Sequence, residues 1–315
     1  MTRAGVPPRL LSSDASDDLP TVYIVTPCRN AADTLDETIG SVAGQQGPFR
    51  VRYHVQDGAS TDHTLKVLRR WSERLSDDAA GIRFSWSSAP DFGMYHALAR
   101  GFDQLRPRPS DVLTWINSDD LIMPNSISRI IQIFESDSTI SWLTGPARVI
   151  DQEGRLVLER NTPPSTEIVR AGLCDGLLWN HLQQEGTFFR YWLWFCCRHC
   201  LAGHRLAGDW RLWREFAMHA NLYHVSEPLG SFRQRPGQMS VDQANAYADE
   251  IDSTLNRDQR LSAFRSLFER RDELSAATVH IDDRGNLSHE RRGIKDDFAD
   301  FARQAGRTLA AQTAP

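Results

Sequence analysis

Two adjacent carboxylates, Asp119 and Asp120, have the residue types and spacing most suited to chemistry. They end the run Asn117-Ser118-Asp119-Asp120, which directly follows a short apolar segment. Neighbouring carboxylates repel each other, so such a pair is tolerated where a cation or hydrogen-bond donors offset the charge. Mg²⁺ or Mn²⁺ would bind carboxylate oxygens, share its shell with phosphate and neutralise a leaving diphosphate. The run favours a divalent-metal and phosphate site; the alternative is that one acid caps a following helix.

Two further acids can each be interpreted in two ways. Asp57 lies in residues 56–62, Gln-Asp-Gly-Ala-Ser-Thr-Asp, which could bind a base or ribose. Taken alone, this segment favours an ordinary turn with a helix cap at Ser60 or Thr61. Asp209 begins an amphipathic helical pattern, where an acid is usually a cap. The alternative for Asp209 is a general base that takes a proton from an acceptor hydroxyl.

Other polar residues have weaker signals. Gln184 and Glu185 precede the apolar Phe188-Phe189 and form either a polar rim or an acceptor contact. Arg233 and Arg235 are either surface arginines or ligands of a diphosphate.

A cysteine cluster invites a zinc interpretation. Cys196, Cys197 and Cys200 lie close together with His204 nearby, but there is no second CxxC at finger or ribbon spacing. Buried free thiols are the favoured interpretation.

Strands and helices that alternate along the chain must position these residues. We predict strands at 21–26, 50–55, 82–86 and 112–116, with helices after Asp33 or Thr34, after residue 62, at 95–105 and at 124–134. This order predicts a mostly parallel sheet with helices on both faces, and ligands bind beyond the carboxyl ends of such strands. The clusters around Asn30, Asp57 and Asp119 lie at those ends. No GxGxxG or GxxxxGK[ST] fingerprint of nicotinamide or P-loop sites is present.

Composition narrows the class further. The chain has 315 residues, 40% of them hydrophobic, and a net charge of −5. It can therefore bury a core, and its charge gives no case for a nucleic-acid partner. No apolar run reaches the about 18 residues of a membrane span. We expect residues 1–20 to be disordered and without a signal peptide, and the protein to be cytoplasmic.

The C-terminal part, residues 241–315, has a different pattern. Leu261, Phe264 and Leu267-Phe268 form a helical stripe, followed by a predicted hairpin at 279–287 and a helix at 294–310. The stripe could pack on the preceding domain, pair two chains as a homodimer or touch a membrane surface. Its balanced charge does not favour anionic lipid.

These clusters, in this order, resemble the family-2 glycosyltransferases, which are inverting enzymes of the GT-A fold. The resemblance covers roughly residues 21–240 and is strongest at 26–46, 56–62 and 115–120. It implies an α/β fold with a mostly parallel central sheet flanked by helices, and a mainly helical C-terminal extension. The implied division is a disordered segment at 1–20, a GT-A domain at 21–240 and the extension at 241–315.

The resemblance also implies a role for each matching residue. Asp209 would be the catalytic base, and Asp119 would ligate Mn²⁺ or Mg²⁺. Arg233 and Arg235 would meet the diphosphate, and Gln184, Glu185 and Trp210 would line the acceptor side. The nucleotide-sugar pocket would be formed by Thr26, Pro27, Arg29, Asn30, Asp57, Asp91, Asn117, Ser118 and Asp120.

Several positions depart from the family pattern. Asn117 replaces the first Asp of the DxD motif, and Gly208 replaces a Glu before the base. His96 and Ala99 stand where many relatives have Asp and Asn. Arg235 lies near a position where many relatives carry a histidine; an arginine supplies positive charge but does not ligate metal.

We therefore expect an inverting, metal-dependent transfer of sugar from a UDP, GDP or dTDP sugar to a saccharide or glycolipid hydroxyl. Bacterial relatives suggest cell-surface polysaccharide or glycolipid synthesis, in the cytoplasm or at the inner face of the plasma membrane. A nucleotidyltransferase is disfavoured because Pro-Cys-Arg-Asn replaces its glycine- and lysine-rich loop. A degenerate nucleotide-sugar-binding scaffold of the same fold is the remaining alternative.

Overall fold

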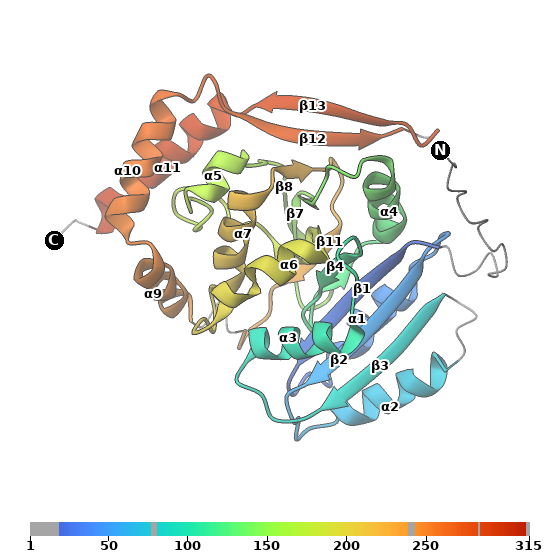
Figure 1. The fold of residues 1–315 in the computed structure, drawn as a ribbon. Helices are drawn as coiled ribbons and strands as arrows, with labels where there is room; N and C mark the ends of the chain where they lie inside the picture. The colour runs from blue at the N-terminus through green and yellow to red at the C-terminus, as the bar shows by residue number, and fades with distance from the viewer. Residues whose placement is uncertain (1–18, 77–80, 239–242, 283, 313–315) are drawn as a thin grey trace, which may run out of the picture.

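The fold is built on a nine-stranded mixed sheet (Figure 1). The computed structural model describes residues 19–76, 81–238, 243–282 and 284–312. The strand order is β13-β12-β10-β6-β9-β4-β1-β2-β3. Five neighbouring pairs are parallel and three are antiparallel. The predicted disordered segment falls almost entirely on residues 1–18, which lie outside the described residues.

The N-terminal half confirms the predicted alternation of strands and helices. Short β-branched and aromatic runs form the strands, and amphipathic segments form the helices between them. The strands are β1 (Thr21–Cys28), β2 (Arg50–Asp57), β3 (Ile82–Ser88) and β4 (Val112–Trp115). The helices are α1 (Leu35–Ala43), α2 (Thr64–Arg74), α3 (Met94–Leu105) and α4 (Ser126–Ser136). Helix α4 begins two residues later than predicted, because Asn125 before it has a left-handed backbone with φ 63°.

The parallel strands place the site. The strands β4, β1, β2 and β3 are all parallel. The chain adds β2 and β3 on one side of β1 and then crosses to add β4 on the other side, so the carboxyl ends of β1 and β4 form a topological switch point. Ligand sites in open α/β sheets form at such a point. The polar clusters after β1, β2 and β4 therefore meet at one edge of the sheet.

The middle of the chain completes the large sheet and adds a small one. Antiparallel β9 (Thr187–Arg190) lies between β4 and β6 (Trp142–Thr144), and β10 (Leu222–His224) pairs with β6. The small sheet has the order β5-β11-β7-β8. Its strands are β5 (Leu121–Ile122), β11 (Gly230–Arg233), β7 (Ala147–Ile150) and β8 (Leu156–Arg160). The helical elements here are α5 (Thr166–Arg170), η2 (Gln184–Gly186), α6 (Tyr191–Cys197), η3 (Arg198–Leu201) and α7 (Gly208–His219).

The C-terminal part packs on the preceding domain, as one of the sequence alternatives proposed. It contains α9 (Ala244–Thr254), α10 (Arg257–Glu269), hairpin β12 (Ser275–Ile281) and β13 (Leu287–Gly293), and α11 (Lys295–Gln312). Strand β12 extends the large sheet through β10, at the edge opposite β3 (Figure 1). Phe264 and Phe298 belong to the same apolar cluster as Trp213. The apolar core therefore continues beyond residue 240, where the sequence resemblance ends.

No helix in the described ranges has both the length and the apolar character to cross a bilayer.

Aromatic packing dominates the core on the α7 side of the sheet. Trp213 of α7 stacks on Trp115 and Trp142, with ring centroids 5.2 and 6.0 Å apart. All three indoles are at most 2% exposed. The stack ties α7, which carries Asp209, to strands β4 and β6.

We expect Trp213→Ala to lower the free energy of unfolding by about 3–5 kcal/mol, because it removes buried apolar area and leaves a cavity. Chemical denaturation checks this value. Met218→Ala on the same helix is the matched control, since Met218 is 56% exposed, and it changes stability by less than about 0.5 kcal/mol. Equal, small effects of both substitutions would contradict a core role for the stack.

Candidate active site

Helix α1 holds the acidic turn 117–120 in place. Thr34 Oγ1 donates to the Ser118 carbonyl at 2.8 Å, and Thr38 Oγ1 donates to the Asp120 carbonyl at 2.9 Å. The turn leads into β5, and the N-cap residue of α4 is Asn125. The alternative in which Asp119 or Asp120 caps the following helix is therefore wrong.

Hydrogen-bond donors offset the charge of the two acids. Asp119, 7% exposed, accepts at Oδ2 from Arg235 Nε at 2.9 Å and from Gln238 Nε2 at 3.1 Å. Asp120 is fully buried and accepts from the Arg233 amide at 2.8 Å and from Asn117 Nδ2 at 3.0 Å. These contacts supply what the sequence required of a tolerated acid pair.

The two arginines predicted at the diphosphate differ in availability. Arg233 is 2% exposed, and its guanidinium donates to Glu37 at 2.5 Å and to the carbonyls of Asp119 and Gln152, each at 2.9 Å. Arg233 therefore clamps the acidic turn from inside. Arg235 has a side chain that is 37% exposed and beside Asp119, which makes it the better placed of the two for an incoming anion.

Glu185 brings a third buried carboxylate to the acidic turn. It lies in η2 and is 4% exposed, and its Oε2 is buried without a hydrogen-bond partner. Burial raises the pKa of Glu185 to about 7, and repulsion from Asp209 and Asp119 contributes. Burial also raises the pKa of Asp120 well above its usual range, and repulsion from Glu185 is the next cause. Like charges this close do not both ionise readily, so the pair retains a proton near neutral pH.

Turn 56–62 is fastened to the end of β1. Asn30, with a left-handed φ of 51°, accepts at Oδ1 from the Thr61 amide at 2.9 Å, and its own amide donates to Ser60 Oγ at 2.7 Å. Asp57 is fully buried and accepts from the Ser60 amide at 3.0 Å and from Ser88 Oγ at 2.5 Å. The predicted Ser60 or Thr61 helix cap is absent, because the N-cap residue of α2 is His63.

The other residues predicted to contact the nucleotide differ in their exposure to solvent. Arg29 and Asn30 are exposed, whereas Pro27 is buried. Thr26 is also buried, and its hydroxyl lies 2.9 Å from the Tyr53 hydroxyl within the sheet. Thr26 and Pro27 are therefore buried parts of β1 and not exposed contacts for a ligand.

Asp91 adjoins turn 56–62. A Cβ atom on Gly58 would lie 2.8 Å from Asp91 Oδ2, so glycine allows this close approach. The structure thus gathers Asn30, Asp57 and Asp91 at the carboxyl ends of β1, β2 and β3.

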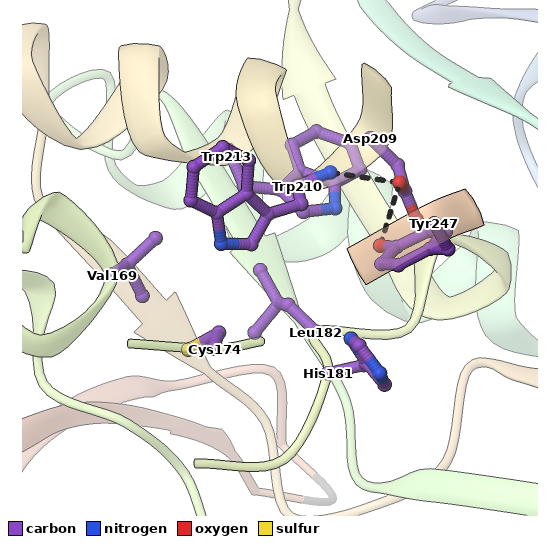
Figure 2. Close-up of a pocket in the computed structure, with 8 residues that line it drawn as sticks. All are labelled: Val169, Cys174, His181, Leu182, Asp209, Trp210, Trp213 and Tyr247. Carbon is purple, nitrogen blue, oxygen red and sulfur yellow. Dashed lines mark hydrogen bonds between the residues drawn. The ribbon is translucent and has the colours of Figure 1, made fainter. Parts of the chain in front are cut away.

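Asp209 is half-buried and close enough to Glu185 for its charge to raise the pKa of Glu185. The N-cap residue of α7 is Ala207, and Asp209 follows in the first turn of the helix. Its Oδ1 accepts from the Trp210 amide at 2.8 Å and from the Tyr247 hydroxyl at 3.1 Å (Figure 2). Burial raises the pKa of Asp209, although these hydrogen bonds and the charge of His181 oppose the increase.

Residues predicted on the acceptor side are buried near Asp209. Gln184 is 6% exposed and donates to the Trp115 carbonyl at 3.4 Å. Trp210 is 4% exposed and donates from Nε1 to the Gly172 carbonyl at 3.2 Å. The cavity beside Asp209 measures about 10 Å³, which is too small for a sugar. An acceptor would have to approach from outside this cavity.

Several side chains at the site have no recognisable signal in the sequence. Glu37, Gln238 and Tyr247 contact Arg233, Asp119 and Asp209 from positions 38 to 196 residues away in the chain. No spacing rule links partners so distant. Tyr95 was predicted only as the first residue of the helix at 95–105, yet its hydroxyl accepts from the Asp209 amide at 2.9 Å.

The donor set for a divalent cation is oxygen-rich and small. Within the described ranges, no three His, Cys, Asp or Glu side chains are grouped to hold a metal. A hard cation beside phosphates needs only one or two carboxylates, because phosphate oxygens complete its shell. Asp119 supplies a carboxylate, and Asn117 has a buried Oδ1 without a hydrogen-bond partner. These donors fit Mn²⁺ or Mg²⁺ together with a diphosphate.

The cysteine cluster consists of free thiols. Cys197 and Cys200 are buried, and burial raises the pKa of each to about 12, so both stay protonated. Cys196 is exposed, and within the described residues no three His, Cys, Asp or Glu side chains are grouped to hold a metal. This arrangement favours free thiols over a zinc site.

The sheet, its switch point and the acids beyond its strands define the GT-A glycosyltransferase fold. The chain belongs to glycosyl transferase family 2, whose sequence model matches residues 23–213. Hyaluronan synthase of Streptococcus pyogenes is 28% identical over 137 residues, 43% of this chain and 32% of that protein. An uncharacterized glycosyltransferase of Mycobacterium tuberculosis is 28% identical over 127 residues, 40% of this chain and 44% of that protein. The matched regions thus span less than half the length of these relatives.

Solved structures show the same fold. S. aureus TarS 1-349 in complex with UDP-GlcNAc has a TM-score of 0.53 and 15% identity, covering 69% of this chain and 60% of that one. S. aureus TarS 1-349 without that ligand also has a TM-score of 0.53, covering 80% and 71%. At this identity the likeness concerns the fold.

Gly208 explains one departure from the family pattern. A Cβ atom there would lie 2.5 Å from the Tyr95 ring, so any larger residue displaces Tyr95. We expect Gly208→Ala to lower the free energy of unfolding by about 1–3 kcal/mol through overpacking, measured by chemical denaturation. Gly306→Ala in α11 is the control, because its Cβ would meet nothing within 4 Å. A Gly208→Ala protein as stable as wild type would refute this explanation.

Proposed function

We propose that this protein is an inverting glycosyltransferase that moves a sugar from a nucleotide-diphosphate sugar to an acceptor hydroxyl. The observation that carries the proposal is the row of carboxyl groups from Asp119 and Asp120 through Glu185 to Asp209. Repulsion from both Asp119 and Asp209 contributes to the raised pKa of Glu185, so Glu185 lies within electrostatic range of both acids. One end of this row adjoins the nucleotide-side strand ends, and the other end carries a half-buried acid.

The residues divide into donor and acceptor functions. The nucleotide and sugar would be contacted by Arg29, Asn30, Asp57, Asp91, Asn117 and Ser118. Arg235 would meet the diphosphate, since its guanidinium is partly exposed beside Asp119 and arginine binds phosphate oxygens in a forked geometry. Glu185 and Gln184 would form the wall between donor and acceptor.

The transfer would be a single displacement. Asp209 accepts the proton of the acceptor hydroxyl as the oxygen bonds to the anomeric carbon. The bond from that carbon to the diphosphate oxygen breaks, and its electron pair leaves with the diphosphate. Attack from the face opposite the leaving group inverts the anomeric configuration. The half-buried environment of Asp209 leaves its carboxylate within reach of a hydroxyl.

A divalent cation would be held by Asp119 and, through its side-chain oxygen, by Asn117. When bound, Mn²⁺ or Mg²⁺ would stabilise the negative charge of the departing diphosphate. Arg235 already lies against Asp119 Oδ2 at 2.9 Å, so this chain has a fixed positive charge at the same place.

The names of similar proteins support a nucleotide-diphosphate sugar as the donor but do not identify its nucleotide base. TarS was solved with UDP-GlcNAc, and hyaluronan synthase is a polysaccharide-forming enzyme by name. A saccharide or glycolipid acceptor in cell-surface synthesis is the setting that we propose. The alternative, a degenerate binding scaffold, draws on the substitutions at His96, Ala99 and Gly208.

We expect Asp209→Asn to reduce sugar transfer by about 100- to 10,000-fold while donor affinity stays within about twofold. Asparagine keeps the Oδ1 acceptor but does not take a proton. In the wild type, kcat/KM should fall as pH falls through the pKa of Asp209, which burial raises, because only the ionised form is a base. Transfer assays and calorimetric donor titration check both quantities. Wild-type transfer by Asp209→Asn would exclude Asp209 as the base, and donor binding without any turnover of wild type would favour the scaffold.

We expect removal of divalent metal by EDTA to lower turnover of the donor by about 100-fold or more, with recovery on adding Mn²⁺. Asp119→Asn should remove most of the Mn²⁺-dependent part of UDP binding, measured by calorimetry with and without the metal. Asp103→Asn, at an exposed ion pair on α3, is the control for a charge change. Full turnover in EDTA would show that Arg235 and the surrounding donors suffice without a metal.

A further inference from the structure

Helix α9 contacts the proposed base, although it lies beyond the residues matched by the family. The Tyr247 hydroxyl donates to Asp209 Oδ1 at 3.1 Å (Figure 2). Burial and the neighbouring charge of Asp209 raise the pKa of Tyr247 well above its usual range. Tyr247 therefore stays protonated, and a hydrogen-bond donor, around neutral pH. Both side-chain contacts of Asp209 recorded within the described ranges involve Oδ1, which leaves Oδ2 for a hydroxyl.

A second residue of α9 fixes the start of α7. The Glu250 carboxylate accepts from three successive amides, those of Arg205, Leu206 and Ala207, at 2.9–3.2 Å. Successive amides that converge on an anion form a nest, and hydrogen bonds to a charged acceptor are stronger than neutral ones. Because Ala207 immediately precedes α7, Glu250 sets where Asp209 enters the helix.

Apolar and ionic contacts hold α9 in this position. Ile251, 1% exposed, packs with Ala207 and Trp210 in a separate small cluster. Arg260 of α10 donates to Asp252 at 2.7 Å and to Asp175 at 2.9 Å. Asp175 follows Cys174, which lines the same cavity as Asp209. The helix is thus anchored on both sides of the base.

We propose that α9 is a positioning element of the active site, in which Tyr247 orients the Asp209 carboxylate and Glu250 fixes the backbone that carries it. The proposal rests on the proposed role of Asp209 as the base. It assigns a function to part of the C-terminal extension that the fold alone treats as packing. Neither residue touches the reacting atoms, so both act through Asp209.

Charged and titratable groups reach Asp209 from several elements. Tyr95 of α3 and Tyr247 of α9 are its hydroxyl neighbours. His181 lines the cavity and lowers the pKa of Asp209 by its charge, and Glu185 of η2 is an acid whose own pKa is raised by the charge of Asp209. Glu250 is directed to the backbone amides. Loss of the Tyr247 donor therefore shifts the pKa of Asp209 upward, with the other groups unchanged.

The test compares Tyr247→Phe and Glu250→Gln with wild type and with Asp249→Asn, an exposed acid on the same helix. The probes are UDP-GlcNAc, UDP-glucose and GDP-mannose with Mn²⁺, and the readout is nucleoside diphosphate release with water as acceptor. We expect Tyr247→Phe to lower kcat about 10- to 100-fold, the loss of a hydrogen bond to a charged group. Donor affinity should stay within about twofold, and the acid limb of the pH profile should move upward.

Glu250→Gln has a readout that does not need turnover. We expect faster hydrogen exchange at the amides of residues 205–207, which lose a charged acceptor, while exchange in the core strands stays as in wild type. Asp249→Asn should change neither exchange nor kcat. Wild-type exchange in Glu250→Gln, or an unchanged kcat and pH profile in Tyr247→Phe, would overturn the positioning role. Loss of donor affinity together with kcat would overturn it as well, by showing general structural damage.

Failure of the base assignment is separable from failure of this proposal. If Asp209→Asn turns over donor like wild type, the proposed function fails and the α9 proposal with it. If Asp209→Asn is inactive while Tyr247→Phe and Glu250→Gln match wild type, the α9 proposal alone fails. Thermal unfolding of each variant identifies any protein that is not folded, and Tyr247→Trp then serves as the second variant, since it removes the hydroxyl and fills the space.

Discussion

Burial of negative charge is the constraint on which the rest of this site depends. Asp119, Asp120 and Glu185 are each at most 7% exposed. A carboxylate withdrawn from water costs several kcal/mol unless donors or cations offset the loss of hydration. The groups that make this burial tolerable come from β11, from the segment that follows it and from the acidic turn itself.

The small sheet supplies one of the groups that offset the buried negative charge. Strand β11 places Arg233 beneath the acidic turn, where its guanidinium joins Glu37 of α1 to the Asp119 carbonyl. The same strand approaches η2 so closely that a Cβ on Gly230 would lie 2.1 Å from the Glu185 carbonyl oxygen. Both contacts require β11 to lie in the same position. The placement of the small sheet and the placement of the acids therefore depend on each other.

Positive charge at the diphosphate would come from two sources in this chain. Arg235 is permanently charged and lies beside Asp119, whereas a cation would arrive with the donor. An incoming diphosphate would offer Arg235 a second anionic partner and free a carboxylate oxygen of Asp119. The resemblance puts Arg235 near a position where many relatives carry a histidine, and an arginine supplies a fixed positive charge but does not ligate metal. Asp209, the proposed base, is contacted separately, by Tyr95 of α3 and Tyr247 of α9.

The amino-acid sequence by itself determined the strands, the helices and the polar clusters at the strand ends, because hydrophobic period and turn residues act locally. It also determined the hairpin and final helix of the tail, which follow from short-range patterns. It did not determine that Arg233 is buried, that Thr26 is buried within the sheet, or that neither acid of the turn caps α4. Those outcomes depend on which elements meet in space. Only the tertiary structure decided that Tyr247 and Glu250 reach Asp209, because hydrogen bonds between distant segments leave no periodic trace in the chain.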